Sequence, residues 1–238
     1  MGKELLVLGI ESTAHTLGFG IVSSEGRILA NVNYTYKPKE GGIHPREAAQ
    51  HHSAIASTGI AEAFRQADIS PEELDGIAFS VGPGMGPCLR VGATIARTLA
   101  LKLEKPLIAV NHGVAHIEIG RLVTGCKDPV VLYVAGGNTL ITAYMDRRYR
   151  IFGETLDIAA GNCLDVFGIK AGIGPMPAPE EYGRRGRRFH PLPYKVKGMD
   201  VSFSGLLTAA LRMLKEGVAL EDLCLSITET VYLSLIHI

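Results

Sequence analysis

Two histidines four residues apart, His112 and His116, are the side chains in this sequence whose spacing best suits chemistry. Four residues make about one helical turn, so both imidazoles would project from the same face of a helix. Imidazoles at that spacing can bind one metal ion. The same spacing also arises by chance or from packing, since the chain holds 8 histidines. Glycine-rich turns at residues 82–86 and 136–137 flank the pair and favour the metal site.

Length and composition narrow the class of protein. The 238 residues, of which 47% are hydrophobic, suffice for one large domain or two lobes. The 24 basic residues equal the 24 acidic ones, so any contact with RNA requires a local patch. The 4 cysteines form no C-x-x-C motif, which indicates reduced thiols. No signal peptide opens the chain, and no apolar run approaches the ~18 residues that cross a bilayer. We therefore expect a soluble, cytoplasmic protein that does not contact membranes.

The first half of the chain reads as strands followed by helices. Strands are predicted at residues 4–11, 18–23 and 27–34, and the short polar turns between them indicate an antiparallel meander. Glu11 closes the first strand, where it could face a ligand or simply lie in a hairpin turn. An amphipathic helix is predicted over residues 45–67, since apolar residues recur behind a proline. His51 and His52 in its middle are interpreted as surface or packing residues.

A glycine-rich loop at residues 82–87 separates a predicted strand, 76–81, from a predicted helix, 88–103. This arrangement can present backbone N–H groups to an anion. The loop lacks the Lys-Ser/Thr pair of a Walker motif, and a tight turn that brings helix and sheet together is an equal alternative. A further strand at 106–110 leads directly into the helix of the two histidines.

The second half repeats the opening pattern. Strands at residues 130–134, 140–144 and 149–153 form another predicted meander around a glycine pair. This internal repeat predicts two lobes, residues 1–127 with the histidine helix and residues 128–238. The fold class is α/β, a duplicated ribonuclease-H-like fold of the actin, Hsp70 and sugar-kinase type, with a nucleotide in its cleft.

Helices are predicted over residues 160–167, 204–214 and 220–236, and a basic run lies between the first two. It forms either a solvated surface or a patch for RNA phosphates. Its members are Arg184, Arg185, Arg187, Arg188, Lys195 and Lys197.

Seven segments in the same order resemble a known family, from Leu5 to about Tyr232. They are GIESTAHTLGFGIV, GGIHPREAAQHH, FSVGPGMGP, NHGVAHIEIGR, LYVAGGNT, FGETLDIAAGN and VKGMDVSFSGLLT. The family is the archaeal and eukaryotic tRNA N6-adenosine threonylcarbamoyltransferases, the catalytic subunits of the KEOPS complex. The resemblance implies transfer of a threonylcarbamoyl group from threonylcarbamoyl-AMP to the adenosine beside the anticodon, in tRNAs that read codons beginning with A. It also implies three kinds of partner subunit: a small kinase-like ATPase, a dimerising subunit and an accessory subunit.

The resemblance also assigns roles to individual residues. His112, His116 and Tyr133 would bind one divalent metal ion, for which iron or zinc suits better than magnesium. The ion would act as a Lewis acid on the carbamoyl carbonyl. Glu11 matches an acidic residue that faces the cleft and is the catalytic candidate. The expected substrate-binding residues, which would contact the donor or an adenine nucleotide, are Tyr133, Val134, Ala135, Gly136, Gly137, Asn138, Asp165 and Glu180.

Two stretches depart from the family pattern. A Pro-Gly-Gly loop and a glutamate are expected where this chain has residues 175–180, so Glu180 is the matching acid only if the shorter loop permits it. Family members also continue into a Gly-Gly-Val-x-x-Asn loop and an Asp-Asn-Gly segment with the last metal ligand, whereas this chain stops at Ile238. We therefore expect a truncated chain with an incomplete second lobe, weak stability and no activity of its own.

Three other functions are compatible with parts of the pattern. A metallopeptidase would need His-Glu-x-x-His, but Gly113 stands where the general base belongs. A small-molecule kinase of the same fold would need a catalytic aspartate, for which Asp157 is the nearest candidate. A scaffold would use the helix at 45–67 to dock partner subunits, and the family resemblance supports this as an additional role.

Overall fold

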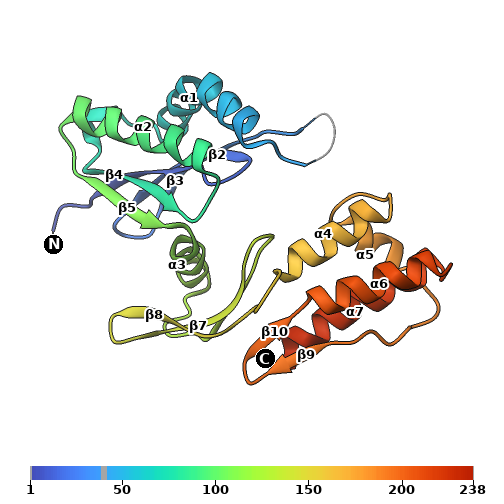
Figure 1. The fold of residues 1–238 in the computed structure, drawn as a ribbon. Coiled ribbons are helices and arrows are strands. Elements are labelled where there is room, and N and C mark those ends of the chain that lie inside the picture. The colour runs from blue at the N-terminus through green and yellow to red at the C-terminus, as the bar shows by residue number, and fades with distance from the viewer. Residues whose placement is uncertain (1, 39–41, 238) are drawn as a thin grey trace. The chain divides into compact units, whose positions relative to one another are not determined.

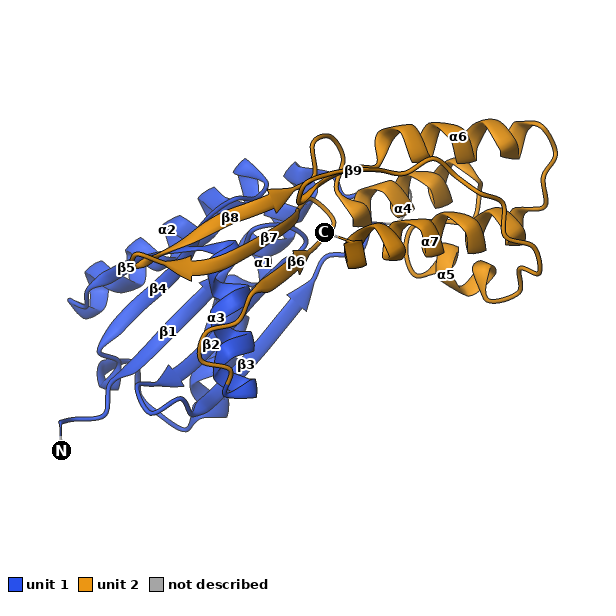
Figure 2. Ribbon diagram, turned by 90° about the horizontal axis from the view of Figure 1, so that it is seen from below, with its two compact units in different colours: residues 1–125 blue, residues 126–238 orange. Residues whose placement is uncertain are grey.

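The computed structural model describes residues 2–38 and 42–237, in two compact units, Met1–Gly125 and Cys126–Ile238 (Figure 2). The division falls two residues before the boundary expected from the sequence. The two meanders lie one in each unit, as the internal repeat predicts.

The first unit is built on a five-stranded sheet in the order β3-β2-β1-β4-β5 (Figure 1). β1, β2 and β3 form the predicted antiparallel meander, while β4 and β5 run parallel to β1. Helices α1 and α2 pack on one face of the sheet, and α3 follows β5 directly. The bounds are β1 Leu6–Glu11, β2 Thr16–Ser23, β3 Ile28–Thr35, α1 Pro45–Ala67, η1 Pro71–Glu73, β4 Gly76–Gly82, α2 Gly86–Leu103, β5 Leu107–Asn111 and α3 His112–Thr124.

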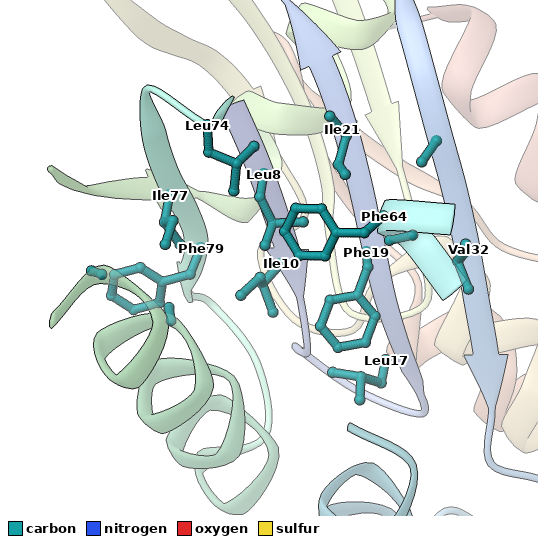
Figure 3. Packing of buried hydrophobic residues seen from close by; sticks show 14 residues of the cluster. Leu8, Ile10, Leu17, Phe19, Ile21, Val32, Phe64, Leu74, Ile77 and Phe79 are labelled. Carbon is teal, nitrogen blue, oxygen red and sulfur yellow. The ribbon is translucent and has the colours of Figure 1, made fainter. Parts of the chain in front are cut away.

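The core of this unit follows from the two-residue period of its strands. Alternate side chains of β1 and β2, among them Leu8 and Phe19, are fully buried in the cluster that Figure 3 shows. Glycines occupy the positions between them and line the opposite face, where a shallow pocket also includes Glu11 and Ala115 of α3. The sheet therefore buries one face under α1 and α2 and turns its glycine-lined face toward the histidine helix.

The second unit combines a three-stranded antiparallel sheet, in the order β6-β7-β8, with four helices and a two-stranded ribbon. Its core lies among the helices and includes Phe167, Phe203 and Leu223, all 0–1% exposed. The bounds are β6 Val131–Val134, β7 Thr139–Met145, β8 Arg148–Glu154, α4 Ala160–Lys170, α5 Ala178–Gly183, β9 Lys195–Lys197, β10 Asp200–Ser202, α6 Ser204–Lys215 and α7 Leu220–His237.

Three elements of this unit were not predicted: α5 and the ribbon strands β9 and β10. Each is six residues or shorter, too short for a recognisable period. The ribbon turns at Gly198, whose φ of 63° suits glycine, and it is fixed by burial of Val201 in the helical core. In neither unit do the described residues include a helix that is both long and apolar enough to cross a bilayer.

Candidate functional site

The two histidines lie at the start of α3, one turn apart as predicted. Asn111 caps this helix by accepting a hydrogen bond from Val114 N at 3.2 Å, which starts the helix at His112. The Nε2 atoms of His112 and His116 are 3.2 Å apart. An ion at the usual metal–nitrogen distance of about 2.1 Å from both atoms would be held at an angle of roughly 100°. The donor pair therefore fits a divalent ion that prefers imidazole nitrogen.

The lowered pKa of His116 also favours metal binding. Partial desolvation, followed by the neighbouring ring of His112, lowers the pKa of His116. Both effects favour the neutral imidazole, and only neutral imidazole offers a lone pair to a metal.

Glu11 lies beside this pair, although 101 positions separate it from His112 in the sequence. Its Oε2 atom is 3.2 Å from Nδ1 of His112. A carboxylate accepts, so Nδ1 carries the proton and Nε2 is left free to face His116. The other carboxylate oxygen accepts from the backbone N and the hydroxyl of Thr13, which fixes the orientation of Glu11. The structure thus gives the catalytic candidate a specific place, as the partner that sets the His112 tautomer.

Four segments that are separate in the sequence hold the loop that follows Glu11. Its bonds are Ser12 N to Ser80 Oγ (3.2 Å), Met85 N to Thr13 O (2.7 Å), His52 Nε2 to Ala14 O (3.0 Å) and Tyr36 N to His15 O (2.7 Å). His52 is fully buried, and burial is the main cause that lowers its pKa, so Nε2–H donates to Ala14 O. Its interpretation as a packing residue is confirmed, but no local pattern indicated that it binds this loop.

The glycine-rich loop at residues 82–87 approaches the same segment closely. A Cβ atom on Gly84 would lie 2.6 Å from the carbonyl oxygen of Thr13 and 2.9 Å from its Cα. Only glycine permits this contact. The geometry supports the tight-turn interpretation of the loop, in which the start of α2 packs against the residues after β1.

In the second unit, the turn between β6 and β7 carries the expected donor-binding residues. Ala135 N donates to Asn138 O at 2.8 Å, and this bond closes the turn. Nothing lies within 4 Å of a Cβ position on Gly136 or Gly137, so this face of the turn is open. The turn also touches the start of α4, where a Cβ on Gly161 would be 3.0 Å from Ala135 O. Backbone groups are thus accessible there, as the glycine pair suggests.

The two acidic candidates of this unit have structural partners. Asp165, on α4, accepts a hydrogen bond from Met176 N at 2.9 Å and so holds the loop at 175–180 against that helix. Glu180, on α5, forms an ion pair with Arg184 at 2.9 Å.

Tyr133 and Val134 stand on β6, in the second unit, whereas Glu11, His112 and His116 stand in the first. The approach of Tyr133 to the histidines therefore stays a prediction. No three His, Cys, Asp or Glu side chains are grouped for a metal within the described part of the chain. A phenol such as that of Tyr133 lies outside those residue types.

Comparison with known proteins decides the family. A family model described as tRNA N6-adenosine threonylcarbamoyltransferase matches residues 27–238. A protein of that name from Thermofilum pendens is 58% identical over 239 residues, which are 99% of this chain and 71% of the relative. The one from Caldivirga maquilingensis is 54% identical over 237 residues, 98% of this chain and 71% of the relative. The chain belongs to this threonylcarbamoyltransferase family.

Other members and more distant folds agree with this assignment. A threonylcarbamoyltransferase relative from Methanocaldococcus jannaschii, named a probable bifunctional tRNA threonylcarbamoyladenosine biosynthesis protein, is 52% identical over 98% of this chain, which spans 44% of that protein. Among solved structures, T. kodakarensis HypF aligns with a TM-score of 0.65 at 13% identity, over 97% of this chain and 39% of its own. Component A of the Acidaminococcus fermentans (R)-2-hydroxyglutaryl-CoA dehydratase aligns with a TM-score of 0.59 at 12% identity, over 99% of this chain and 77% of its own. These likenesses confirm the predicted ribonuclease-H-like α/β fold.

Neither membership of this family nor the surroundings of Asp157 favour the kinase alternative. Its carboxylate accepts bonds from Phe203 N (2.9 Å) and Ser204 N (3.2 Å) at the start of α6, and from the hydroxyls of Ser202 and Ser204. An aspartate engaged in this way caps a helix and is not free to take a proton from a substrate hydroxyl. Asp157 is therefore a structural residue in this threonylcarbamoyltransferase chain.

We expect Asp157→Asn to reduce the acid sensitivity of the fold. Burial would raise the pKa of Asp157, but hydrogen bonds from Ser202, Ser204 and Phe203 outweigh it and hold the pKa far below its usual range. The charged form therefore stabilises the native state above the unfolded pKa of about 3.9, and this contribution is lost as the pH falls below that value.

Urea unfolding at neutral pH and near pH 3 measures the effect. The asparagine variant should be less stable at neutral pH by about 1 kcal/mol, because neutral hydrogen bonds are weaker than those to a charged carboxylate and Asp157 is exposed to solvent. Its loss of stability on acidification should be smaller than that of the natural chain. Asp146→Asn is the control, because the Asp146 side chain is 75% exposed and, among the described residues, pairs only with Arg150. Equal acid profiles for the Asp157 variant and the natural chain would contradict the capping role.

Proposed function

We propose that the site on this chain serves the transfer of a threonylcarbamoyl group from threonylcarbamoyl-AMP to N6 of the adenosine beside the anticodon, in tRNAs that read codons beginning with A. The observation that carries this function is membership of the tRNA N6-adenosine threonylcarbamoyltransferase family, at 52–58% identity over nearly the whole chain. The peptidase alternative lacks the glutamate that it needs at Gly113.

The metal proposal rests on His112 and His116, with Tyr133 as a third ligand. Two imidazoles and a phenolate suit Fe²⁺ or Zn²⁺. When bound, such an ion supplies Lewis-acid chemistry toward a carbonyl oxygen. The chain's own contribution is to orient the ligands: Glu11 fixes the tautomer of His112, and the cap at Asn111 starts α3 so that the two rings stand one turn apart on its first two turns.

The donor proposal rests on the β6–β7 turn and its neighbours. The open backbone at Gly136 and Gly137 allows close approach of a carbamoyl-adenylate, and the adjacent Val134, Ala135 and Asn138 complete the turn. Asp165 would bind ribose hydroxyls through the carboxylate oxygen that does not hold Met176 N. Glu180 would approach the adenosine only by giving up part of its ion pair with Arg184.

Partners and location are proposed from the family. The chain would act with the KEOPS subunits, namely the small kinase-like ATPase, the dimerising subunit and the accessory subunit, and α1 offers a long helix for docking. The bifunctional relatives carry names of the same biosynthesis. A cytoplasmic location agrees with the buried, unbridged thiols of Cys88, Cys163 and Cys224.

A direct assay tests the function. The protein is incubated with threonylcarbamoyl-AMP, tRNA and Fe²⁺ or Zn²⁺, and the digested tRNA is analysed for the modified nucleoside. The second sample is a fusion protein. It joins the residues of the Thermofilum pendens relative that follow the matched region to Ile238 of this chain, which spans 71% of that relative. Modified nucleoside from either sample supports the proposal. Phosphorylated metabolite or cleaved peptide in place of modified tRNA would contradict it.

We expect Glu11→Gln to weaken metal binding by about 10- to 100-fold, the usual cost of losing the hydrogen bond behind a ligating histidine. In the variant, the backbone N and the hydroxyl of Thr13 still donate to the one oxygen of the glutamine amide. The amide NH₂ group therefore faces His112. Nδ1 of His112 must then accept, which moves its proton to Nε2 and removes the ligand lone pair.

Isothermal titration calorimetry with Zn²⁺ measures this affinity. The exposed Glu25→Gln variant is the control, because Glu25 lies in the turn between β2 and β3, at the end of the sheet opposite Glu11. Melting temperatures show whether each variant retains the fold. Unchanged zinc affinity in a folded Glu11→Gln protein would refute the role given to Glu11.

A further inference from the structure

Charge is concentrated in one segment of this otherwise neutral chain. Residues 182–199 contain six of the 24 basic residues and none of the 24 acidic ones. We call residues 184–197 of this segment the basic strap. The remaining residues together carry a corresponding excess of acid, so the positive potential of the protein is local to the strap.

The backbone of the strap is fixed along α7. Arg187 N and Arg188 N both donate to Asp222 Oδ1, at 2.7 and 3.0 Å. His190 N donates to Ser226 Oγ at 2.8 Å, one turn further along the helix. These bonds order the first part of the strap against the start of α7. The hydrogen bond from Arg187 N is the largest cause that lowers the pKa of Asp222. The carboxylate therefore stays charged and continues to accept both backbone hydrogen bonds.

The strap continues to the other end of the same helix. Leu192 is buried in the helical core, and the ring of Tyr194 stacks on that of His237 at 6.2 Å. α7 has 18 residues and is therefore about 27 Å long. Lys195 and Lys197 follow on the ribbon strand β9, with exposed side chains. The strap thus presents basic groups near both ends of a rigid helix, which Figure 1 shows in red.

The arginines fall into two pairs. Arg184 and Arg185 have intramolecular partners: Arg184 pairs with Glu180 at 2.9 Å, and the Arg185 guanidinium lies 4.3 Å from the centre of the Tyr182 ring. The exposed guanidinium groups of Arg187 and Arg188 make no hydrogen bond or ion pair within the described residues, although their backbones are fixed. Phe189, the next residue, is an exposed aromatic side chain.

We propose that the basic strap binds the phosphate backbone of the RNA substrate, with Arg187 and Arg188 as its main contacts and Phe189 as a stacking surface for an unpaired base. This inference rests on the proposed function and adds to it the site of RNA contact. Arginine matches phosphate bidentately, and a fixed backbone reduces the entropy lost on binding. Aromatic side chains stack on splayed bases in RNA recognition. An anionic lipid surface is the less suitable polyanion, because interfacial binding needs a continuous apolar face beside the charges. The large apolar side chains that the strap exposes are Phe189 and Tyr194, which stand five residues apart.

The test compares tRNA binding by the whole chain and by two variants of equal charge. R187Q/R188Q removes the two unpaired guanidinium groups, and R212Q/K215Q removes two exposed charges from α6 in the same unit. Fluorescence anisotropy with a labelled tRNA transcript gives Kd at several salt concentrations. We expect R187Q/R188Q to bind about tenfold more weakly and to reduce the slope of log K against log salt by roughly 1.5. The α6 variant should bind like the natural chain.

The outcomes separate this inference from the proposed function. If the natural chain binds or modifies tRNA and R187Q/R188Q binds it with the same Kd and the same salt slope, the role of the basic strap is refuted. The proposed function is then unaffected. Equal losses in both variants would also overturn it, because they would show a response to net charge alone. Loss of binding to phosphatidylserine vesicles, with tRNA binding unchanged, would assign the strap to lipid and refute the inference. Melting temperatures should change little, because these guanidinium groups form no hydrogen bond or ion pair within the described residues and only the charge of Arg188 acts on Asp222.

Discussion

Replacing His116 by alanine should abolish binding of the divalent ion and reduce threonylcarbamoyl transfer by more than about 100-fold, since loss of a ligand costs at least as much as loss of its supporting hydrogen bond. The remaining imidazole of His112 is then a single ligand on α3. The substitution lies on an exposed position one turn into the helix, and alanine is a good helix former, so the fold should be retained.

Two measurements test this expectation. Metal analysis of the purified protein should fall from about one ion per chain to almost none. The transfer assay should show the parallel loss of modified nucleoside. His44→Ala is the matched control, since His44 is exposed and makes no side-chain cap at α1. Full transfer by a metal-free His116→Ala protein would exclude a resident ion from the reaction.

Gly92→Ala should destabilise the protein by about 3 kcal/mol, the upper range for overpacking a well-filled core. A Cβ atom at this position of α2 would lie 1.9 Å from Ser12 Oγ and 2.8 Å from Ser12 Cβ. Ser12 is buried and its backbone is bonded to Ser80, so it has little room to move away. The strain falls on the residue next to Glu11, and we therefore expect metal affinity to fall as well.

Gly120→Ala provides a control with the opposite sign. Gly120 is inside α3, and nothing lies within 4 Å of its Cβ position. Alanine there should stabilise the protein by about 0.5–1 kcal/mol through helix propensity. Urea unfolding measures both changes in the free energy of unfolding. Ser12→Gly should relieve part of the Gly92→Ala defect in the double variant. Equal stabilisation by the two alanines would show that α2 does not contact Ser12 as closely as described.

The sequence by itself determined the elements whose period is long and regular. The helix predicted over residues 45–67 has those bounds in the structure, and both meanders occupy their predicted places. His112 and His116 could be placed on one helical face because four residues always make about one turn. The glycine pair at residues 136–137 indicated an open turn because glycine leaves the backbone uncovered. All these properties depend on neighbours in the sequence.

Only the tertiary structure decided which distant residues meet. Glu11 reaches His112 across 101 positions, and His52 binds Ala14 across 38. Asp222 accepts a hydrogen bond from Arg187 N across 35 positions. Arg184 and Arg185, by contrast, have partners for their side chains. No local pattern encodes such pairs, because they depend on how sheet and helices pack. The same reason applies to α5 and the β9–β10 ribbon, which are too short to form on local preference. Contacts with other elements hold them: α5 packs on α7, and Val201 of β10 is buried in the helical core.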